Sequence, residues 1–159
     1  MNKNLPLAAI LCAILSFSVV KAESINLKPY QNGDWSTIVK SANGQPLAVH
    51  IWGVTCAPCV KEMPKWGKYL AKHKDDKVIF MQVDDVSVGM MEKMLLKANL
   101  GEADNYYVST AFDERLRYEI DPKWRGETPI TLLIDRTGKS ERQVGPVDFS
   151  KLQTWFHKY

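Results

Sequence analysis

The hydrophobic positions of the chain alternate between short continuous runs and stripes with helical spacing. Near-continuous apolar runs are typical of strands buried on both faces of a sheet, and they cover residues 47–52, 78–83 and 130–134. Apolar residues three or four positions apart predict helices that begin near residues 35, 56, 88 and 149. Because strands and helices alternate, the pattern predicts an α/β domain with a central sheet and helices on both of its faces.

Local signals refine the ends of these elements. A turn at residues 136–139 leads into a further strand near residues 140–144, which should add an antiparallel edge to the sheet. Asp34 is placed to cap the first helix, and Asn43-Gly44 is placed to end it. Pro64 lies inside the second helix and should kink it.

The first 22 residues have the pattern of a secretory signal. A positively charged start is followed by an uncharged apolar run over residues 5–20, and Val20 and Ala22 supply short apolar residues at positions −3 and −1 of a cut before Glu23. The run is shorter than the roughly 20 apolar residues that cross a bilayer comfortably, so an uncleaved anchor is the less favoured alternative. We therefore assign residues 1–22, with Cys12, to a cleaved signal peptide and residues 23–159 to one domain.

The charge of the chain gives no reason to expect nucleic-acid binding. The 159 residues carry a formal net charge of +3, and loss of the signal peptide removes Lys3 and Lys21 and no acid, which leaves 137 residues and a charge of +1. Export would place the domain in an oxidising compartment, and a bacterial periplasm fits best. A cysteine pair can cycle between its oxidised and reduced forms there.

The sequence Cys56-Ala57-Pro58-Cys59 follows a predicted buried strand and opens the next helix. A helix start offers free backbone N–H groups and a partial positive charge, which stabilise a thiolate on Cys56 and make it the nucleophile of disulfide exchange. Cys59 lies one helical turn further, where its sulfur can resolve a mixed disulfide. Pro58 fits the first turn, where its missing N–H costs nothing.

The residues alone leave two further uses of the cysteine pair open. A structural disulfide over so short a loop would constrain the unfolded chain little. A zinc site needs about four ligands, but there is no second cysteine pair, and His50, His73 and His157 show no ligand spacing. The pattern favours a redox-active pair and predicts no metal site.

Two segments resemble the thioredoxin superfamily. Residues 52–64 (Trp-Gly-Val-Thr-Cys-Ala-Pro-Cys-Val-Lys-Glu-Met-Pro) resemble its active-site segment, and the last four are similar to the exported bacterial TlpA/ResA/CcmG-like branch. Residues 127–138, beginning Glu-Thr-Pro-Ile-Thr, resemble the cis-proline strand and hairpin of that family. The resemblance covers roughly residues 34–158 and implies a thioredoxin-like α/β fold with a central mixed β-sheet.

The resemblance also implies how the site is assembled. The Thr128–Pro129 bond should be cis and should lie against the cysteine pair. The substrate groove is expected to contain Trp52, Ala57, Pro58, Thr128 and Pro129, with Trp52 also shielding the cysteines from water. No bound cofactor is needed, because the electrons come from a partner, which in this branch is typically a membrane-embedded thiol reductase.

Two titratable residues flank the cysteines in the sequence. Glu62 matches the acidic residue that this branch carries three positions after the second cysteine, and a half-buried carboxyl there could exchange a proton with Cys59. A solvated helix glutamate is the alternative. His50 stands where thioredoxins carry a buried aspartate, so that assignment cannot be transferred; a neutral core histidine is favoured over a proton relay.

The sequence thus predicts a monomeric, periplasmic thiol–disulfide oxidoreductase that reduces protein disulfides through Cys56 and Cys59, with Glu62 as the third catalytic residue. Its substrates would be protein disulfides or thiols, such as those of apocytochrome c during cytochrome c maturation. The same fold could instead oxidise protein thiols. The cysteine pair could also bind copper in a chaperone, together with a nearby Met or His, and the domain could be structural rather than catalytic.

Overall fold

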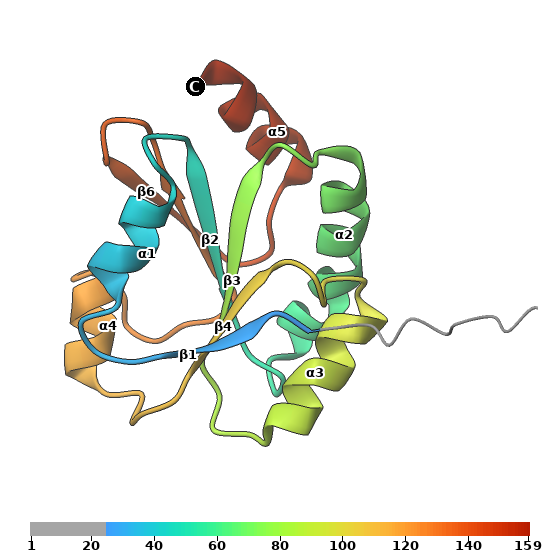
Figure 1. The fold of residues 1–159 in the computed structure, drawn as a ribbon, viewed down its shortest axis with the longest axis vertical. Helices are drawn as coiled ribbons and strands as arrows, with labels where there is room; N and C mark the ends of the chain where they lie inside the picture. The colour runs from blue at the N-terminus through green and yellow to red at the C-terminus, as the bar shows by residue number, and fades with distance from the viewer. Residues whose placement is uncertain (1–24) are drawn as a thin grey trace, which may run out of the picture.

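The computed structural model describes residues 25–159, which form six strands and five helices (Figure 1). The predicted signal peptide, with Cys12, lies outside the described residues. The strands are β1 (Leu27–Tyr30), β2 (Leu47–Trp52), β3 (Lys77–Gln82), β4 (Asp104–Val108), β5 (Ile130–Ile134) and β6 (Ser140–Val144). The helices are α1 (Trp35–Ser41), α2 (Ala57–Lys72), α3 (Val88–Lys97), α4 (Glu114–Ile120) and α5 (Phe149–Lys158).

The six strands join one mixed sheet in the order β1-β4-β3-β2-β5-β6. The first four of these strands are parallel to one another, whereas β5 is antiparallel to β2 and β6 is antiparallel to β5. The predicted α/β fold and its antiparallel edge are therefore confirmed. Because β2 lies between β3 and β5, all six of its residues are buried, as its continuous apolar run indicates.

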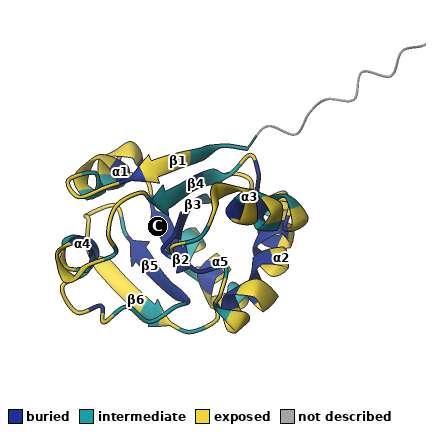
Figure 2. Cartoon of the chain, turned by 90° about the horizontal axis from the view of Figure 1, so that it is seen from below, coloured by how far each residue is buried: buried dark blue, intermediate teal, exposed yellow. Residues whose placement is uncertain are grey.

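The helices cover both faces of the sheet. On one face, Val49 and Ile51 of β2 pack with residues of α1 and α4. On the other face, Ala48 and Trp52 pack with residues of α2, α3 and α5. Figure 2 shows the buried central strands between helices whose outer sides are exposed. Since side chains alternate along a strand, His50 points to the same face as Trp52, toward α2.

Helices α2 and α3 approach each other closely at a glycine. A Cβ atom at Gly67 would overlap the backbone carbonyl oxygen of Ala98, which follows the last residue of α3. The absent side chain thus allows this contact, and it holds α3 beside the helix that begins at the cysteine pair.

The sequence pattern does not predict β1, β4 or α4. β1 is a short edge strand with two exposed residues, β4 has one buried residue among its five, and α4 buries only Leu116 and Ile120. Elements that bury so few side chains leave a weak periodicity in the sequence, and this explains why they were missed.

The first helix begins where the sequence predicts, but its cap is different. Asp34 occupies the N-cap position, yet its carboxylate accepts a hydrogen bond from the Gln31 N–H and none from the helix. The Glu119 carboxylate of α4 instead accepts hydrogen bonds from the N–H groups of Gly33 and Trp35, at 2.9–3.1 Å. The capping prediction for Asp34 is therefore wrong, because a distant carboxylate reaches the positive end of α1.

The other end of α1 agrees with the prediction. Asn43 and Gly44 both have positive φ angles directly after the helix.

Within residues 25–159, none of the helices has the length and apolar character needed to cross a membrane.

Candidate active site

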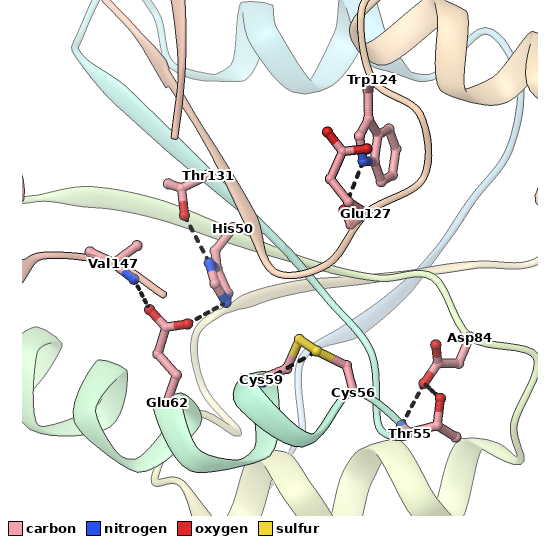
Figure 3. Close-up of a disulfide and its surroundings, with 10 residues drawn as sticks. All are labelled: His50, Thr55, Cys56, Cys59, Glu62, Asp84, Trp124, Glu127, Thr131 and Val147. Carbon is pink, nitrogen blue, oxygen red and sulfur yellow. Dashed lines mark hydrogen bonds and ion pairs between the residues drawn. A yellow bond between two sulfur atoms is a disulfide. The ribbon is translucent and has the colours of Figure 1, made fainter. Parts of the chain in front are cut away.

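The two cysteines lie at the start of α2 and are joined by a disulfide, with their Cα atoms 5.2 Å apart (Figure 3). Cys56 is the N-cap residue, and its sulfur accepts a hydrogen bond from the backbone N–H of Cys59 at 3.3 Å. Cys56 is partly exposed, whereas Cys59 is 0% exposed. The helix start therefore offers the Cys59 N–H to the more accessible sulfur.

A carboxylate holds the loop that leads into the cysteines. Oδ2 of Asp84, just after β3, accepts hydrogen bonds from the backbone N–H of Thr55 at 2.7 Å and from its hydroxyl at 3.1 Å (Figure 3). The same carboxylate lies so close to Gly53 that a Cβ atom there would overlap it. The backbone before Cys56 is thus fixed against the neighbouring strand.

The Thr128–Pro129 bond is cis, which confirms the expectation from the resemblance. Ile130 pairs with Ile51 in the antiparallel β2–β5 ladder, so Pro129 lies at the same edge of the sheet as Trp52, next to the loop that carries the cysteines. The Pro129 carbonyl accepts a hydrogen bond from the Gly145 N–H at 2.8 Å, which ties this strand start to the end of β6.

The remaining residues predicted for the groove differ in their exposure. Ala57 and Pro58 are exposed in the first turn of α2, and Thr128 is partly exposed. Trp52 is only 1% exposed and packs in the same apolar cluster as Cys59. It is thus placed to exclude water from the inner sulfur, and its part in a substrate groove stays a prediction.

Glu62 lies one helical turn after Cys59 and is 2% exposed. Its Oε1 atom accepts a hydrogen bond from the Val147 N–H at 2.6 Å (Figure 3). Burial is the largest effect on this carboxyl and raises its pKa, although the Val147 hydrogen bond, Lys65 and Trp66 act in the opposite direction. Glu62 is therefore a buried titratable group one helical turn from Cys59, and the alternative of a solvated helix glutamate is excluded.

His50 is completely buried and faces Glu62. Its Nδ1 atom lies 2.9 Å from the Thr131 hydroxyl, and its Nε2 atom lies 4.0 Å from Oε2 of Glu62 (Figure 3). Burial lowers the His50 pKa to about 3, so the ring is neutral near pH 7. The 4.0 Å contact between Nε2 and Oε2 of Glu62 is therefore not an ion pair at that pH. Nε2 of His50 and Oε2 of Glu62 both lack a well-formed hydrogen bond, so either atom can carry a proton without breaking an existing hydrogen bond.

Sequence reasoning missed three partners in this site: Asp84, Thr131 and Val147. Asp84 follows a predicted strand that runs parallel to the one before the cysteines, and the carboxyl ends of parallel strands share an edge. That signal could have identified Asp84. Val147 had no such signal, because it contributes a backbone N–H from a loop 85 positions away.

No group of three or more His, Cys, Asp or Glu side chains within residues 25–159 is arranged to hold a metal ion. The chemistry that the site can perform is thiol–disulfide exchange between its own cysteines and a partner, with a buried carboxyl nearby to hold a proton.

Comparisons with curated proteins agree with this chemistry, although no protein-family model matches the chain. Sporulation thiol-disulfide oxidoreductase A of Bacillus subtilis is 24% identical over 125 residues, which cover 70% of this chain and 67% of that protein. Thiol-disulfide oxidoreductase ResA of Bacillus cereus is 24% identical over 123 residues, covering 76% of this chain and 66% of that protein. The chain thus matches about two thirds of the length of these relatives.

Solved structures share the fold. StoA from Bacillus subtilis aligns with a TM-score of 0.52 and 23% identity, over 70% of this chain and 82% of that one. A secreted disulfide oxidoreductase of Mycobacterium tuberculosis, described as homologous to Escherichia coli DsbE, aligns with a TM-score of 0.57 and 17% identity, over 73% and 83%. Together with the cysteine pair at the start of α2, these similarities support a thioredoxin-like fold and thiol–disulfide oxidoreductase activity, and they make the chain similar to the TlpA/ResA/CcmG-like branch of the thioredoxin superfamily.

Proposed function

We propose that this chain is an exported reductant of protein disulfides, in which Cys56 attacks and Cys59 resolves. The observation that carries the assignment is the unequal placement of the two sulfurs. Cys56 is accessible at the positive end of α2, whereas Cys59 is buried behind it. A partly exposed sulfur at a helix start has the lower thiol pKa of such a pair and is the one that a substrate can reach.

In the reducing direction, the Cys56 thiolate attacks one sulfur of the substrate disulfide. A mixed disulfide forms, and the other substrate sulfur leaves as a thiolate that takes up a proton. Cys59 then loses its proton and attacks the Cys56 sulfur, which breaks the mixed disulfide and releases the second substrate thiol. Two electrons have passed to the substrate, and the Cys56–Cys59 disulfide remains.

Glu62 is the residue that we assign to the proton of Cys59. It lies one turn further along α2, and burial already raises the pKa of its carboxyl. A carboxyl with a raised pKa can accept a proton when Cys59 becomes a nucleophile and return it when the pair is reduced again. Thr128 and Pro129, at the neighbouring edge of the sheet, would hold the backbone of the substrate beside Cys56.

A second dithiol must reduce the Cys56–Cys59 disulfide after each cycle. By its resemblance to the TlpA/ResA/CcmG-like branch, we assign this step to a membrane-embedded thiol reductase, and we assign the chain to the periplasm on the pattern of residues 1–22. Protein disulfides such as that of oxidised apocytochrome c are the substrates that this branch suggests, and the protein would act as a monomer without a bound cofactor.

Trapping of mixed disulfides tests the roles of the two cysteines. Cys59→Ser should accumulate mixed disulfides with substrate proteins, because the resolving attack is lost, and Cys56→Ser should trap few. In the reduced protein, iodoacetamide at mildly acidic pH should label Cys56 first. Faster labelling of Cys59, or equal trapping by the two variants, would overturn the assignment.

Thiol trapping in intact cells tests the direction of electron flow. A reductant supplied by a membrane partner should keep Cys56 and Cys59 mostly reduced. A mostly oxidised pair, with a reduction potential near the roughly −120 mV of a strong periplasmic oxidant, would show that the protein oxidises thiols instead.

A further inference from the structure

A groove of about 350 Å³ lies between α2 and α3, beside the cysteine pair. Val54 and Val60 line it, and these residues lie two positions before Cys56 and one position after Cys59. Met63 from α2 and Met94 from α3 contribute further apolar lining. The groove therefore leads along two helices directly to the reactive end of α2.

The groove exposes apolar side chains to solvent. Val60 is 40% exposed and Met90, on α3, is 49% exposed. Exposed apolar surface beside a reactive group marks a place where another molecule binds. Methionine side chains are flexible and polarisable, so a groove that they line can accept apolar side chains of different shapes.

Two positively charged residues of α3 lie beside this apolar surface. Lys93 and Lys97 line the groove, and the two helices together carry six lysines and two glutamates. One of these glutamates is the buried Glu62, so Glu92 is the acid that remains near the surface. The lysines disfavour a Cu(I) ion at the methionine thioethers, although thioether sulfur suits that metal, and they favour an acidic occupant.

We propose that the groove binds a segment of the protein substrate in which a large apolar side chain lies next to acidic residues. This inference rests on the proposed function and names the class of substrate that the same site prefers. A segment held between α2 and α3 keeps its own disulfide close to the Cys56 sulfur, so binding and attack are coupled by proximity.

Charge reversal in the groove tests the proposal. Two synthetic peptides each carry one cysteine in a mixed disulfide with thionitrobenzoate and a nearby leucine, and they differ only in two flanking residues, Glu in one and Lys in the other. The reduced wild-type protein should react about tenfold faster with the Glu peptide at low salt. Lys93→Glu/Lys97→Glu should abolish or invert this ratio of rates.

Lys68→Glu/Lys72→Glu is the matched control. This double variant changes the charge of the α2–α3 pair by the same amount. One of its two lysines, Lys72, lies in the last turn of its helix, as Lys97 does in α3. Neither Lys68 nor Lys72 lines the groove. The ratio of the two peptide rates should stay within about twofold of the wild-type ratio. An unchanged ratio in Lys93→Glu/Lys97→Glu, or an equal change in both double variants, would overturn the proposal.

The apolar part of the groove needs its own test. Met90→Ser, at an exposed position, should reduce the rate advantage of the leucine peptide over a glycine counterpart by about threefold or more. If the wild-type protein sediments as a dimer and Met90→Ser dissociates it, a second copy of the chain fills the groove, and this result would contradict the proposal.

Reduction of hydroxyethyl disulfide distinguishes failure of the proposed function from failure of the groove proposal. A wild-type protein that cannot reduce this small disulfide refutes the proposed function. Reduction of it without any preference between the peptides refutes the groove proposal alone.

Discussion

His50 and Glu62 bring two titratable side chains together where water is excluded. The Nδ1 atom of His50 contacts the Thr131 hydroxyl, and its Nε2 atom faces Glu62; in the tautomer that accepts the Thr131 hydrogen bond at Nδ1, the proton of the neutral ring is on Nε2. The ring is also tilted against Trp66, with centroids 4.9 Å apart, so its orientation is fixed by packing as well as by Thr131. A neutral histidine and a carboxyl thus occupy a region that in thioredoxins holds a buried aspartate.

Glu62→Gln tests whether this carboxyl takes part in exchange. The change keeps the shape but removes the titrating group, so disulfide exchange should slow roughly tenfold or more and its pH profile should change. The Cys59 pKa should fall, since a negative neighbour has gone. The measurement is the exchange rate against pH, with Glu114→Gln on the exposed side of α4 as the control. Superimposable profiles would leave Glu62 without a role in proton transfer.

His50 should make the folded protein sensitive to acid. Its folded pKa of about 3 lies below the ordinary value of 6.5, so between these values the unfolded chain binds the additional proton. Its contribution to the free energy of unfolding therefore falls by about 1.4 kcal/mol for each pH unit as the pH decreases through this window. Glu62 acts with the opposite sign, because its pKa is raised in the folded state.

Urea denaturation at several pH values measures this slope. His50→Gln should flatten it, whereas His157→Gln, at an exposed position of α5, should leave it as in the wild type. Equal slopes for the wild type and His50→Gln would show that His50 is not the acid-sensitive group.

The single residues of the site were predictable only as far as local spacing extends. Cys56, Cys59 and Glu62 lie at the start of one helix, and the spacing of apolar residues predicts that helix. The partners of Glu62 and His50 come from positions 81 to 85 residues away, and local periodicity does not tell which segments meet across a sheet. The sequence therefore allowed a half-buried Glu62 but not its almost complete burial.

At the scale of elements, the contact between α2 and α3 depends on Gly67. Gly67→Ala improves helix propensity by about 1 kcal/mol, but its methyl group would overlap the Ala98 carbonyl. The variant should therefore lower the free energy of unfolding by about 1–3 kcal/mol. Gly89→Ala, in α3 with open space around it, should be neutral or stabilising in the same chemical denaturation experiment. A destabilised Gly89→Ala with an unaffected Gly67→Ala would contradict this account.

The link between β3 and the loop before Cys56 is a second element-scale contact. Asp84→Ala removes both hydrogen bonds to Thr55 and should cost about 1–3 kcal/mol of stability. Exchange should also slow, because the loop is no longer held against the strand. Asp85→Ala, at the exposed neighbouring position, is the control in both denaturation and activity measurements. If the two variants behave alike, the Thr55 contact does not position the cysteines.

The elements that build the centre of the fold could be predicted because they are buried along their whole length. β2 and β5 are fully buried, and their near-continuous apolar runs indicate this burial. β4 could not be predicted in this way, because Asn105 is its one buried residue. The Asn105 side chain donates hydrogen bonds to the carbonyls of Leu100 and Ala103 rather than packing as an apolar residue. Polar burial of this kind leaves no hydrophobic signal.

At the scale of the whole molecule, the proposed export has a direct test. The protein recovered outside the cytoplasm should begin at or near Glu23, because Val20 and Ala22 place short apolar residues at positions −3 and −1 of that cut. N-terminal sequencing of the exported protein measures this. A retained Met1 in the membrane fraction would instead show that the first segment stays as an anchor.

The position of β2 in the sheet also determines how late in folding its surroundings can be completed. One neighbour of β2, the strand β3, follows soon after it in the chain, but its other neighbour, β5, pairs Ile134 with Leu47 across most of the described sequence. Closing so long a loop is slow compared with local pairing. Until residues 130–134 have arrived, the strand that leads to Cys56 has an open edge and lacks Thr131 beside His50. The reactive cysteines are thus among the first functional residues to be synthesised and among the last to acquire their finished surroundings.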